Sequence, residues 1–141
     1  MKKFIPLAAL FISLVFSSVC FAEWTLHGKN KIGGRFYIDL DLIQIKNKQS
    51  VFYWQLIDYA KPTKFGDLSD KAFTEADCGN PRDGFLRDRK RRVLTVSFYK
   101  QPMAQGDPLL TVSKTQEWAY PMPGSGMEAI LKTVCALAEK K

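Results

Sequence analysis

Histidine and cysteine are scarce in this sequence, which has one histidine and three cysteines in 141 residues. Zinc sites draw their tetrahedral ligand sets largely from these two residue types, so we expect no metal site of this kind. The lone histidine, His27, has no G-x-S-x-G elbow or comparable nucleophile context to accompany it. We interpret it as an exposed structural residue rather than a member of a catalytic triad.

Phosphate loops and carboxylate pairs with a clear catalytic spacing are also missing. Gly33 and Gly34 precede a strand pattern and open no helix, so they indicate a turn. Asp39 and Asp41 lie two residues apart without a third ligand or calcium-loop spacing, and we interpret them as a solvated strand face. The sequence therefore predicts a protein that is not an enzyme and that uses no cofactor.

Long hydrophobic runs are limited to one, at the N-terminus. A basic start is followed by an uncharged run over residues 4–22, and the small residues Cys20 and Ala22 stand three and one positions before a cleavage site. This pattern predicts a secretory signal peptide over 1–22, cleaved after Ala22, and a mature domain over 23–141. No later run approaches the ~20 residues of a membrane span, so we expect no transmembrane segment.

A lipid anchor at Cys20 is the weaker alternative for the N-terminus. Residues 17–19 lack the leucine and the small residue that precede the cysteine of a lipid-attachment signal. Ordinary cleavage also leaves an even pair, Cys78 and Cys135, in an oxidising compartment, which predicts a disulfide. Such a bond would close a loop of roughly 58 residues and stabilise the fold by about 4 kcal/mol in the chain-entropy model.

Acidic residues are outnumbered, 14 against 21 Lys and Arg, which gives a formal net charge of +7. Two of these lysines leave with the signal peptide, and the segment 82–92 alone carries six basic and two acidic residues. The basic residues of this segment form a candidate binding patch: Arg82, Arg87, Arg89, Lys90, Arg91 and Arg92. The patch would attract anionic lipids or glycans, but a solvated loop that protects a strand edge explains it too. Nucleic acid is not expected as a partner, because export removes the usual opportunity to meet it.

Alternating apolar and polar residues predict an antiparallel sheet of about six strands. The clearest pattern covers 35–42, and a second pattern covers 51–59 after a turn at 47–50, as in an antiparallel hairpin. The other predicted strands cover the segments 24–27, 72–78, 93–99 and 109–113. No repeat and no internal domain boundary interrupts the predicted mature domain.

The hydrophobic period becomes helical near the C-terminus. Apolar residues from Met127 to Ala138 follow a helical stripe that includes Cys135, and Ser125 with Glu128 fits a capping box. A Cys78–Cys135 bond would therefore tie this helix to the sheet. The predicted fold class is α+β, a single antiparallel sheet of about six strands with a C-terminal α-helix tethered by a disulfide.

One helix covers only one face of such a sheet. We expect the other face to carry these side chains: Tyr37, Tyr53, Ile57, Tyr59 and Tyr99. Either the sheet curls onto itself, loops fold across this face, or a partner covers it. We favour loops, with the segment 114–124 and its Trp118 as the cover, and leave a partner open.

In their order and spacing, segments of the predicted mature chain resemble the surface-adhesin protein E family of Gram-negative envelope proteins. The matching segments are Trp24, Phe36 to Leu40, Val51 to Tyr59, Leu68 to Lys71, Asp77 and Cys78, Tyr99, Met103 to Gly106, Trp118 to Tyr120, Pro123 to Ser125, and Val134 with Cys135. The resemblance implies the same antiparallel sheet and disulfide-joined helix. It also implies an exported adhesin that binds host matrix or plasma proteins and can self-associate.

Two functional hypotheses follow. The first is an exported non-enzymatic binding protein that contacts host matrix proteins, plasma proteins or anionic glycans through its sheet face or the basic segment. The alternative is a periplasmic structural or accessory domain that forms a homodimer and binds no host ligand. The chain lacks the family's lipid-attachment pattern at Cys20, so periplasm and outer cell envelope both remain open.

Overall fold

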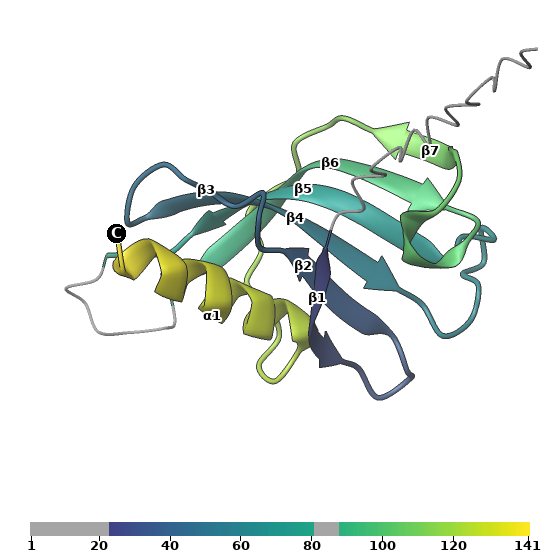
Figure 1. Ribbon diagram of the computed structural model, residues 1–141, viewed down its shortest axis with the longest axis horizontal. Helices are drawn as coiled ribbons and strands as arrows, with labels where there is room; N and C mark the ends of the chain where they lie inside the picture. Colours follow the sequence, from purple (N-terminus) through teal and green to yellow (C-terminus); the bar gives the residue numbers. More distant parts are fainter. Residues whose placement is uncertain (1–22, 81–87) are drawn as a thin grey trace, which may run out of the picture.

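The computed structural model describes residues 23–80 and 88–141, and the predicted signal peptide lies outside this part of the chain. The described residues form one seven-stranded antiparallel sheet and one C-terminal α-helix (Figure 1). The strands are β1 (Trp24–Lys29), β2 (Arg35–Asp39), β3 (Gln44–Ile45), β4 (Ser50–Asp58), β5 (Ser69–Asp77), β6 (Lys90–Tyr99) and β7 (Pro108–Val112). The predicted fold class is confirmed.

The sheet is a meander in which strands that follow one another in the chain lie side by side. Its order is β1-β2-β4-β5-β6-β7, and the two-residue β3 pairs with β4 outside this path. The predicted hairpin is present, since β2 pairs with β4 in antiparallel register. Among the described strands, β1 and β7 form the two edges.

Helix α1 (Gly126–Glu139) packs diagonally across one face of the sheet (Figure 1). It begins as predicted, because the Ser125 hydroxyl accepts a hydrogen bond from the Glu128 amide at 3.2 Å. Its buried stripe joins sheet residues in the main core, which consists of Phe36, Ile38, Val51, Tyr53, Ala76, Cys78, Ile130, Leu131, Val134, Cys135 and Ala138. The predicted disulfide between Cys78 and Cys135 fixes the C-terminal half of α1 to the end of β5. No helix among the described residues is long and apolar enough to cross a membrane.

The assignment of Tyr53, Ile57 and Tyr59 to the uncovered face was wrong. Ile57 packs against the main core, and the Tyr59 hydroxyl donates to Asp70, which lies opposite Ile57 on the same side. Ile38 of β2 lies opposite Gln55 of β4, so the odd-numbered residues of β4 share the face of Ile38, and Tyr53 is fully buried under α1. The other face, called the outer face below, carries Phe52 and Trp54 instead. Both sides of β4 are apolar, so periodicity alone does not fix which side faces the helix; the pairing register does.

Loops cover only the two ends of the outer face, and the segment 114–124, which the sequence favoured as the cover, accounts for one of them. At one end the 3₁₀ turn η3 (Pro102–Ala104) closes over β4 and β5: the Met103 amide donates to Asp58 Oδ1 and the Ala104 amide to Ser69 Oγ, each at 2.9 Å. At the other end Trp118 packs on the first residues of β6. The middle of the outer face lies between these two covers.

Several strand boundaries differ from the predicted ones, and two of these differences affect the candidate sites. Strand β2 ends at Asp39 rather than Leu42, because Asp39 Oδ1 accepts the amides of Asp41 at 3.0 Å and Leu42 at 3.2 Å and so turns the chain. Asp39 is 2% exposed, so its interpretation as part of a solvated face was wrong. Strand β6 begins at Lys90, which places basic residues inside the sheet rather than in a loop.

His27 is not the exposed residue that the sequence suggested. It lies on β1 against α1, with its Nδ1 atom 3.3 Å from the Thr133 hydroxyl. Its Nε2 atom is buried, and burial lowers the pKa of the imidazole. The contact ties β1 to the helix and indicates a structural role.

Candidate functional site

The predicted basic patch lies at the start of β6, where the sheet meets the C-terminal segment. Arg82 and Arg87 lie outside the described residues. Arg89 immediately precedes the strand and Lys90, Arg91 and Arg92 open it. The strand is held on one side by β5 and on the other by Ala119, whose amide donates to the Arg91 carbonyl at 2.8 Å and whose carbonyl accepts the Arg91 amide at 2.9 Å.

Most of the positive charge of this patch is balanced by acids from other elements. Lys90 and Arg92 lie opposite Asp77 and Glu75 of β5, and the ion pairs measure 3.6 Å and 2.8 Å. Arg89 pairs with Glu139 at the end of α1 at 2.8 Å. Three of the four described cations are therefore paired with acids, which leaves a net local charge of about one positive unit for these seven side chains. The sequence count overstates the local charge, because these acids are remote in the chain or lie in the preceding strand.

Arg91 belongs to the opposite face of the sheet. It lies across from Ala76, which is in the core beneath α1. Burial raises the pKa of the Tyr53 hydroxyl, and the positive charge of Arg91 opposes that rise. Arg91 is thus directed to the helix side and does not share a surface with Lys90 and Arg92.

Trp118 brings an aromatic ring to the two outward cations. The Lys90 ammonium lies 5.2 Å and the Arg92 guanidinium carbon 4.5 Å from the centroid of the indole ring. The backbone bridge between Arg91 and Ala119 holds the segment in this position. Lys90, Arg92 and Trp118 therefore form a cation–aromatic rim at one end of the outer face.

An aromatic strip crosses the middle of the outer face. The rings of Phe52 and Phe73 are stacked with centroids 6.0 Å apart, and Trp54 lies 5.0 Å from Phe73, its cross-strand neighbour. The Lys71 ammonium stands 4.9 Å from the Trp54 centroid. All four side chains are partly exposed. The sequence signal for Phe52 and Trp54 is the alternation in β4, but the opposite side of this strand was expected to be the uncovered one. No face was predicted for Lys71 and Phe73.

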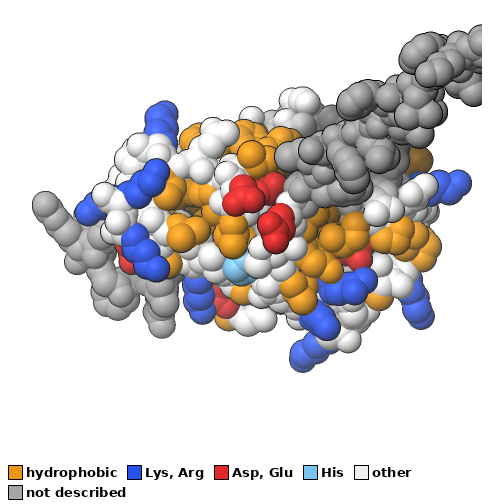
Figure 2. All heavy atoms as spheres, in the orientation of Figure 1, with side chains coloured by type: hydrophobic (Ala, Val, Ile, Leu, Met, Phe, Trp, Pro, Cys, Tyr) orange, Lys and Arg blue, Asp and Glu red, His pale blue; other side chains and the backbone are white. Residues whose placement is uncertain are grey.

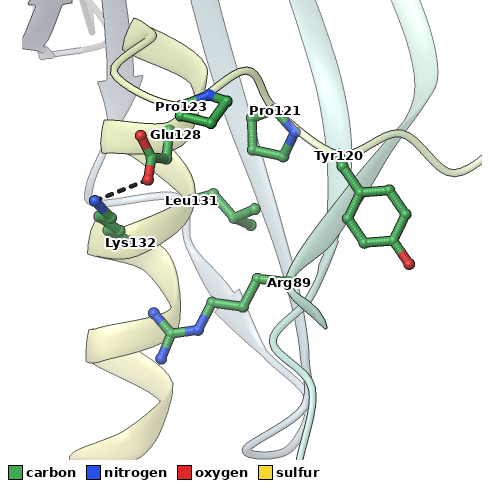
Figure 3. A pocket seen from close by; sticks show the side chains of 7 residues that line it. All are labelled: Arg89, Tyr120, Pro121, Pro123, Glu128, Leu131 and Lys132. Atoms are coloured by element: carbon green, nitrogen blue, oxygen red, sulfur yellow. Dashed lines mark ion pairs between the residues drawn. The ribbon is translucent and has the colours of Figure 1, made fainter. Parts of the chain in front are cut away.

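A cavity of about 440 Å³ lies between α1 and the segment that leads into it (Figure 3). Arg89 extends from the sheet toward α1, and Leu131 projects from the helix toward Pro121 (Figure 3). The Glu128–Lys132 pair on α1 measures 2.9 Å, and Arg89 is held by Glu139. Every charged side chain that lines this cavity is thus already paired, which leaves a largely apolar hollow.

A second cavity, of about 570 Å³, lies between the loop after β4 and the edge strand β7. It is called the β7 cavity below. Its lining residues are Tyr59, Thr63, Lys64, Phe65, Asp67, Phe98, Leu109 and Leu110. No local sequence pattern indicates this cavity, because its walls come from three segments that are distant in the chain.

Metal-ligating groups do not gather in residues 23–80 and 88–141: these residues contain no cluster of three or more His, Cys, Asp or Glu side chains that could hold an ion. Asp39 and Asp41, the acidic pair singled out in the sequence, are used in a turn. Figure 2, in the orientation of Figure 1, shows hydrophobic side chains across the middle of one face and Lys and Arg side chains mainly at its margins.

Comparison with known proteins gives one match. The model of the family described as surface-adhesin protein E matches residues 24–136, which span every described strand and most of α1. No curated protein and no solved structure matches the chain.

Proposed function

Because the chain belongs to the surface-adhesin protein E family, an adhesin-type group of surface proteins, we propose that it is an exported, non-enzymatic binding protein of the cell envelope. Its partner is a matrix or plasma protein of a host, or an anionic glycan. The contact surface is the outer face, and the basic segment forms its rim. Residues 1–22 act as the signal peptide, and 23–141 form the mature domain.

The observation that carries this proposal is the aromatic strip with its cations. Trp54 and Phe73 are partly exposed in the middle of the sheet, and Lys71 stands over the Trp54 ring. Tryptophan and arginine are over-represented among residues that dominate binding energy at interfaces. Rigid strands hold these side chains in place, so a partner would not have to order them on binding.

The ion pairs at the rim are compatible with an anionic partner. The Arg92 and Lys90 side chains are 33% and 30% exposed while they are paired with Glu75 and Asp77. These pairs are half-buried and still reached by solvent, so a carboxylate of a ligand can replace one of the protein at a modest cost. Arg82 and Arg87, outside the described residues, complete the proposed patch.

The outer face is tested by changing Trp54→Ser together with Phe73→Ser. We expect binding to immobilised heparin or plasma proteins to weaken at least about ten-fold, as for a pair of interface hot spots. The matched control changes Ile32→Ser and Met122→Ser, which are 84% and 78% exposed elsewhere. Equal binding by a folded outer-face variant and the control would rule out the outer face as the contact surface.

The rim is tested separately, by changing Lys90→Ser and Arg92→Ser. The control is Lys114→Ser with Lys140→Ser, which removes two exposed lysines outside the patch. Arg91 is left unchanged, because it lies on the helix side. We expect only the rim variant to lose heparin retention and the salt dependence of binding. Retention equal to that of the control would remove the basic segment from the proposal.

The alternative, a self-associating accessory domain, uses the same exposed rings. A second copy would cover Trp54 and Phe73, and the chain would then need no host ligand. Sedimentation at increasing concentration distinguishes the two: a dimer lost in the Trp54→Ser and Phe73→Ser variant supports the alternative, whereas a monomer at all concentrations removes it. Cell fractionation with intact-mass measurement tests export, since cleavage after Ala22 gives a chain that begins at Glu23.

A further inference from the structure

The β7 cavity lies on the helix side of the sheet, beyond the area that α1 covers. Phe98 of β6 stands between Asp70 of β5 and Leu110 of β7 in one cross-strand row, and Asp70 lies opposite Ile57, which packs against the main core. This cavity is therefore on the opposite face from the aromatic strip. Ligand binding in the cavity can therefore be tested independently of binding at the outer face.

The walls of the cavity are apolar and unusually accessible. Phe65, Leu109 and Leu110 are 78%, 53% and 57% exposed, and all three line the same hollow. Phe98 of β6 pairs with Leu110 of β7, and Tyr99 pairs with Pro108. The register shifts between these two pairs, so Leu109 is an extra residue in the edge strand. Bulges of this kind redirect side chains, and here consecutive leucines reach one cavity.

One buried carboxylate lines the polar end of the cavity, and a second is hydrogen-bonded to a lining residue. Asp67 is 4% exposed, lines the cavity and accepts a hydrogen bond from the Thr63 hydroxyl. Asp70 is 6% exposed and accepts one from the Tyr59 hydroxyl, whose ring also lines the cavity. Among the described residues, neither carboxylate forms an ion pair.

Burial without a direct cationic partner is costly for the Asp70 carboxylate. The pKa of the Asp70 carboxyl rises to about 6, first because of burial and also because of the nearby charge of Asp67; the Tyr59 hydroxyl and the more distant Arg91 act in the opposite direction. A cation placed near the two carboxylates would relieve this cost. The site therefore offers apolar walls and a negative end to the same ligand.

We propose that the β7 cavity binds an aliphatic chain that ends in a cation, with the chain against Phe98, Leu109 and Leu110 and the cation near Asp67. The cavity, at about 570 Å³, is within the usual range for ligand sites, about 300–1,000 Å³. The chemistry has two sources: a free alkylamine, or a lysine side chain between apolar residues of a partner's peptide.

Lys64, a cation that lines the cavity, allows the charge of the ligand to be tested. Its ammonium lies 4.9 Å from the centroid of the Phe65 ring. An aromatic wall of the cavity thus already accepts an ammonium group. Because a bound cation would be repelled by Lys64, replacing this lysine with methionine strengthens the binding of a cationic ligand and weakens that of an anionic one.

The first experiment needs no variant. The isotope-labelled protein is titrated with n-octylamine, n-octanol and sodium octanoate at pH 7.5, and the NMR signals of Phe98, Leu109 and Leu110 are followed. We expect octylamine to bind about ten-fold more tightly than octanol, and octanoate more weakly than either, because charged hydrogen bonds are stronger than neutral ones. Octanoate that binds as tightly as octylamine, or shifts confined to other residues, would overturn the proposal.

Variants then assign the two ends of the ligand. Asp67→Asn should reduce octylamine affinity about five- to ten-fold and leave octanol affinity unchanged, whereas Leu110→Thr should weaken both. The controls are Asp41→Asn and Ile32→Thr, which change exposed residues elsewhere. Lys64→Met should increase octylamine affinity. An Asp67→Asn protein that binds octylamine like Asp41→Asn, or a Lys64→Met protein that binds it less well, contradicts the assignment.

The two sources are separated with blocked tripeptides. Acetyl-Leu-Lys-Leu-amide is compared with acetyl-Leu-norleucine-Leu-amide, which keeps the apolar chain without the charge. Tighter binding of the lysine peptide than of octylamine, with shifts that extend along β7, identifies a protein partner as the source. Binding of octylamine alone identifies a free amine. Failure of both cationic probes to bind would exclude the proposed ligand class.

Discussion

The ring of Phe36 lies so close to the backbone of Gly126 that a Cβ atom at Gly126 would stand 2.4 Å from Cδ2 of that ring. The same glycine also faces Gly28 of β1, where a Cβ would stand 3.0 Å from the Gly126 Cα. The start of α1 can therefore meet β1 and β2 only because both approaching residues lack side chains. This contact sets the position of the helix on the sheet.

Gly126→Ala is expected to destabilise the protein by about 1–3 kcal/mol, the usual cost of overpacking a core, despite the higher helix propensity of alanine. Chemical denaturation measures the change. Phe36→Leu removes the ring, so the double variant should be more stable than the sum of the two single effects predicts. Additive effects would show that the close approach does not limit the packing.

The disulfide is expected to contribute about 2–4 kcal/mol to the free energy of unfolding, since it closes a loop between residues 57 positions apart. Cys78→Ala with Cys135→Ala should lower the denaturation midpoint by the corresponding amount without abolishing the sheet, because both positions remain apolar. Thiol titration of a denatured, unreduced chain that begins at Glu23 should find no free thiol. Two free thiols would contradict the bond.

Asp70 is expected to make the protein less stable as the pH rises. Its pKa is about 6 in the folded protein against an ordinary value of 3.8, so the folded state binds the proton more tightly and stability falls between about pH 4 and 6. The pKa difference corresponds to about 3 kcal/mol at pH 7. Asp70→Asn retains an acceptor for the Tyr59 hydroxyl and should raise stability at pH 7.5.

The measurement is urea denaturation of the parent and Asp70→Asn proteins from pH 4 to 7.5. The two stability curves should coincide near pH 4, diverge between about pH 4 and 6, and keep a constant separation above that. Asp41→Asn, a change at an exposed carboxylate, serves as the control and should follow the parent. Parallel curves across this range would show that Asp70 has an ordinary pKa.

Ser125→Ala is expected to destabilise α1 by about 1 kcal/mol, because the Glu128 amide loses its side-chain acceptor. Ser125→Asp should restore most of the stability, since aspartate accepts the same hydrogen bond and favours the positive end of the helix dipole. Thermal unfolding of the three proteins provides the comparison. An Asp variant no more stable than the Ala variant would argue against capping as the cause.

Local patterns were sufficient for most of the secondary structure. The alternation in β4 and β6 and the cap at Ser125 are each encoded within a few residues, so the elements formed near where they were predicted. The end of β2 was missed because the Asp39 side chain competes with the ladder for backbone amides. The two-residue β3 was missed because so short a strand leaves no periodic signal.

The candidate surfaces were less predictable. The net charge of the basic segment depends on Glu75, Asp77 and Glu139, which reach it through strand pairing and helix docking. The β7 cavity depends on a bulge at Leu109 and on the loop after β4. Such features require positions in space that residue types alone do not specify.

The sequence by itself determined the antiparallel strands, the capped helix and the pair Cys78 and Cys135, because these follow from periodicity, local hydrogen bonding and cysteine count. Only the tertiary structure decided which face of β4 meets α1. A strand's period fixes the alternation of its side chains, but the register with its neighbours and the close approach at Gly126 fix which side is buried. That choice buried Tyr53 and left Trp54 on the surface proposed to bind a partner.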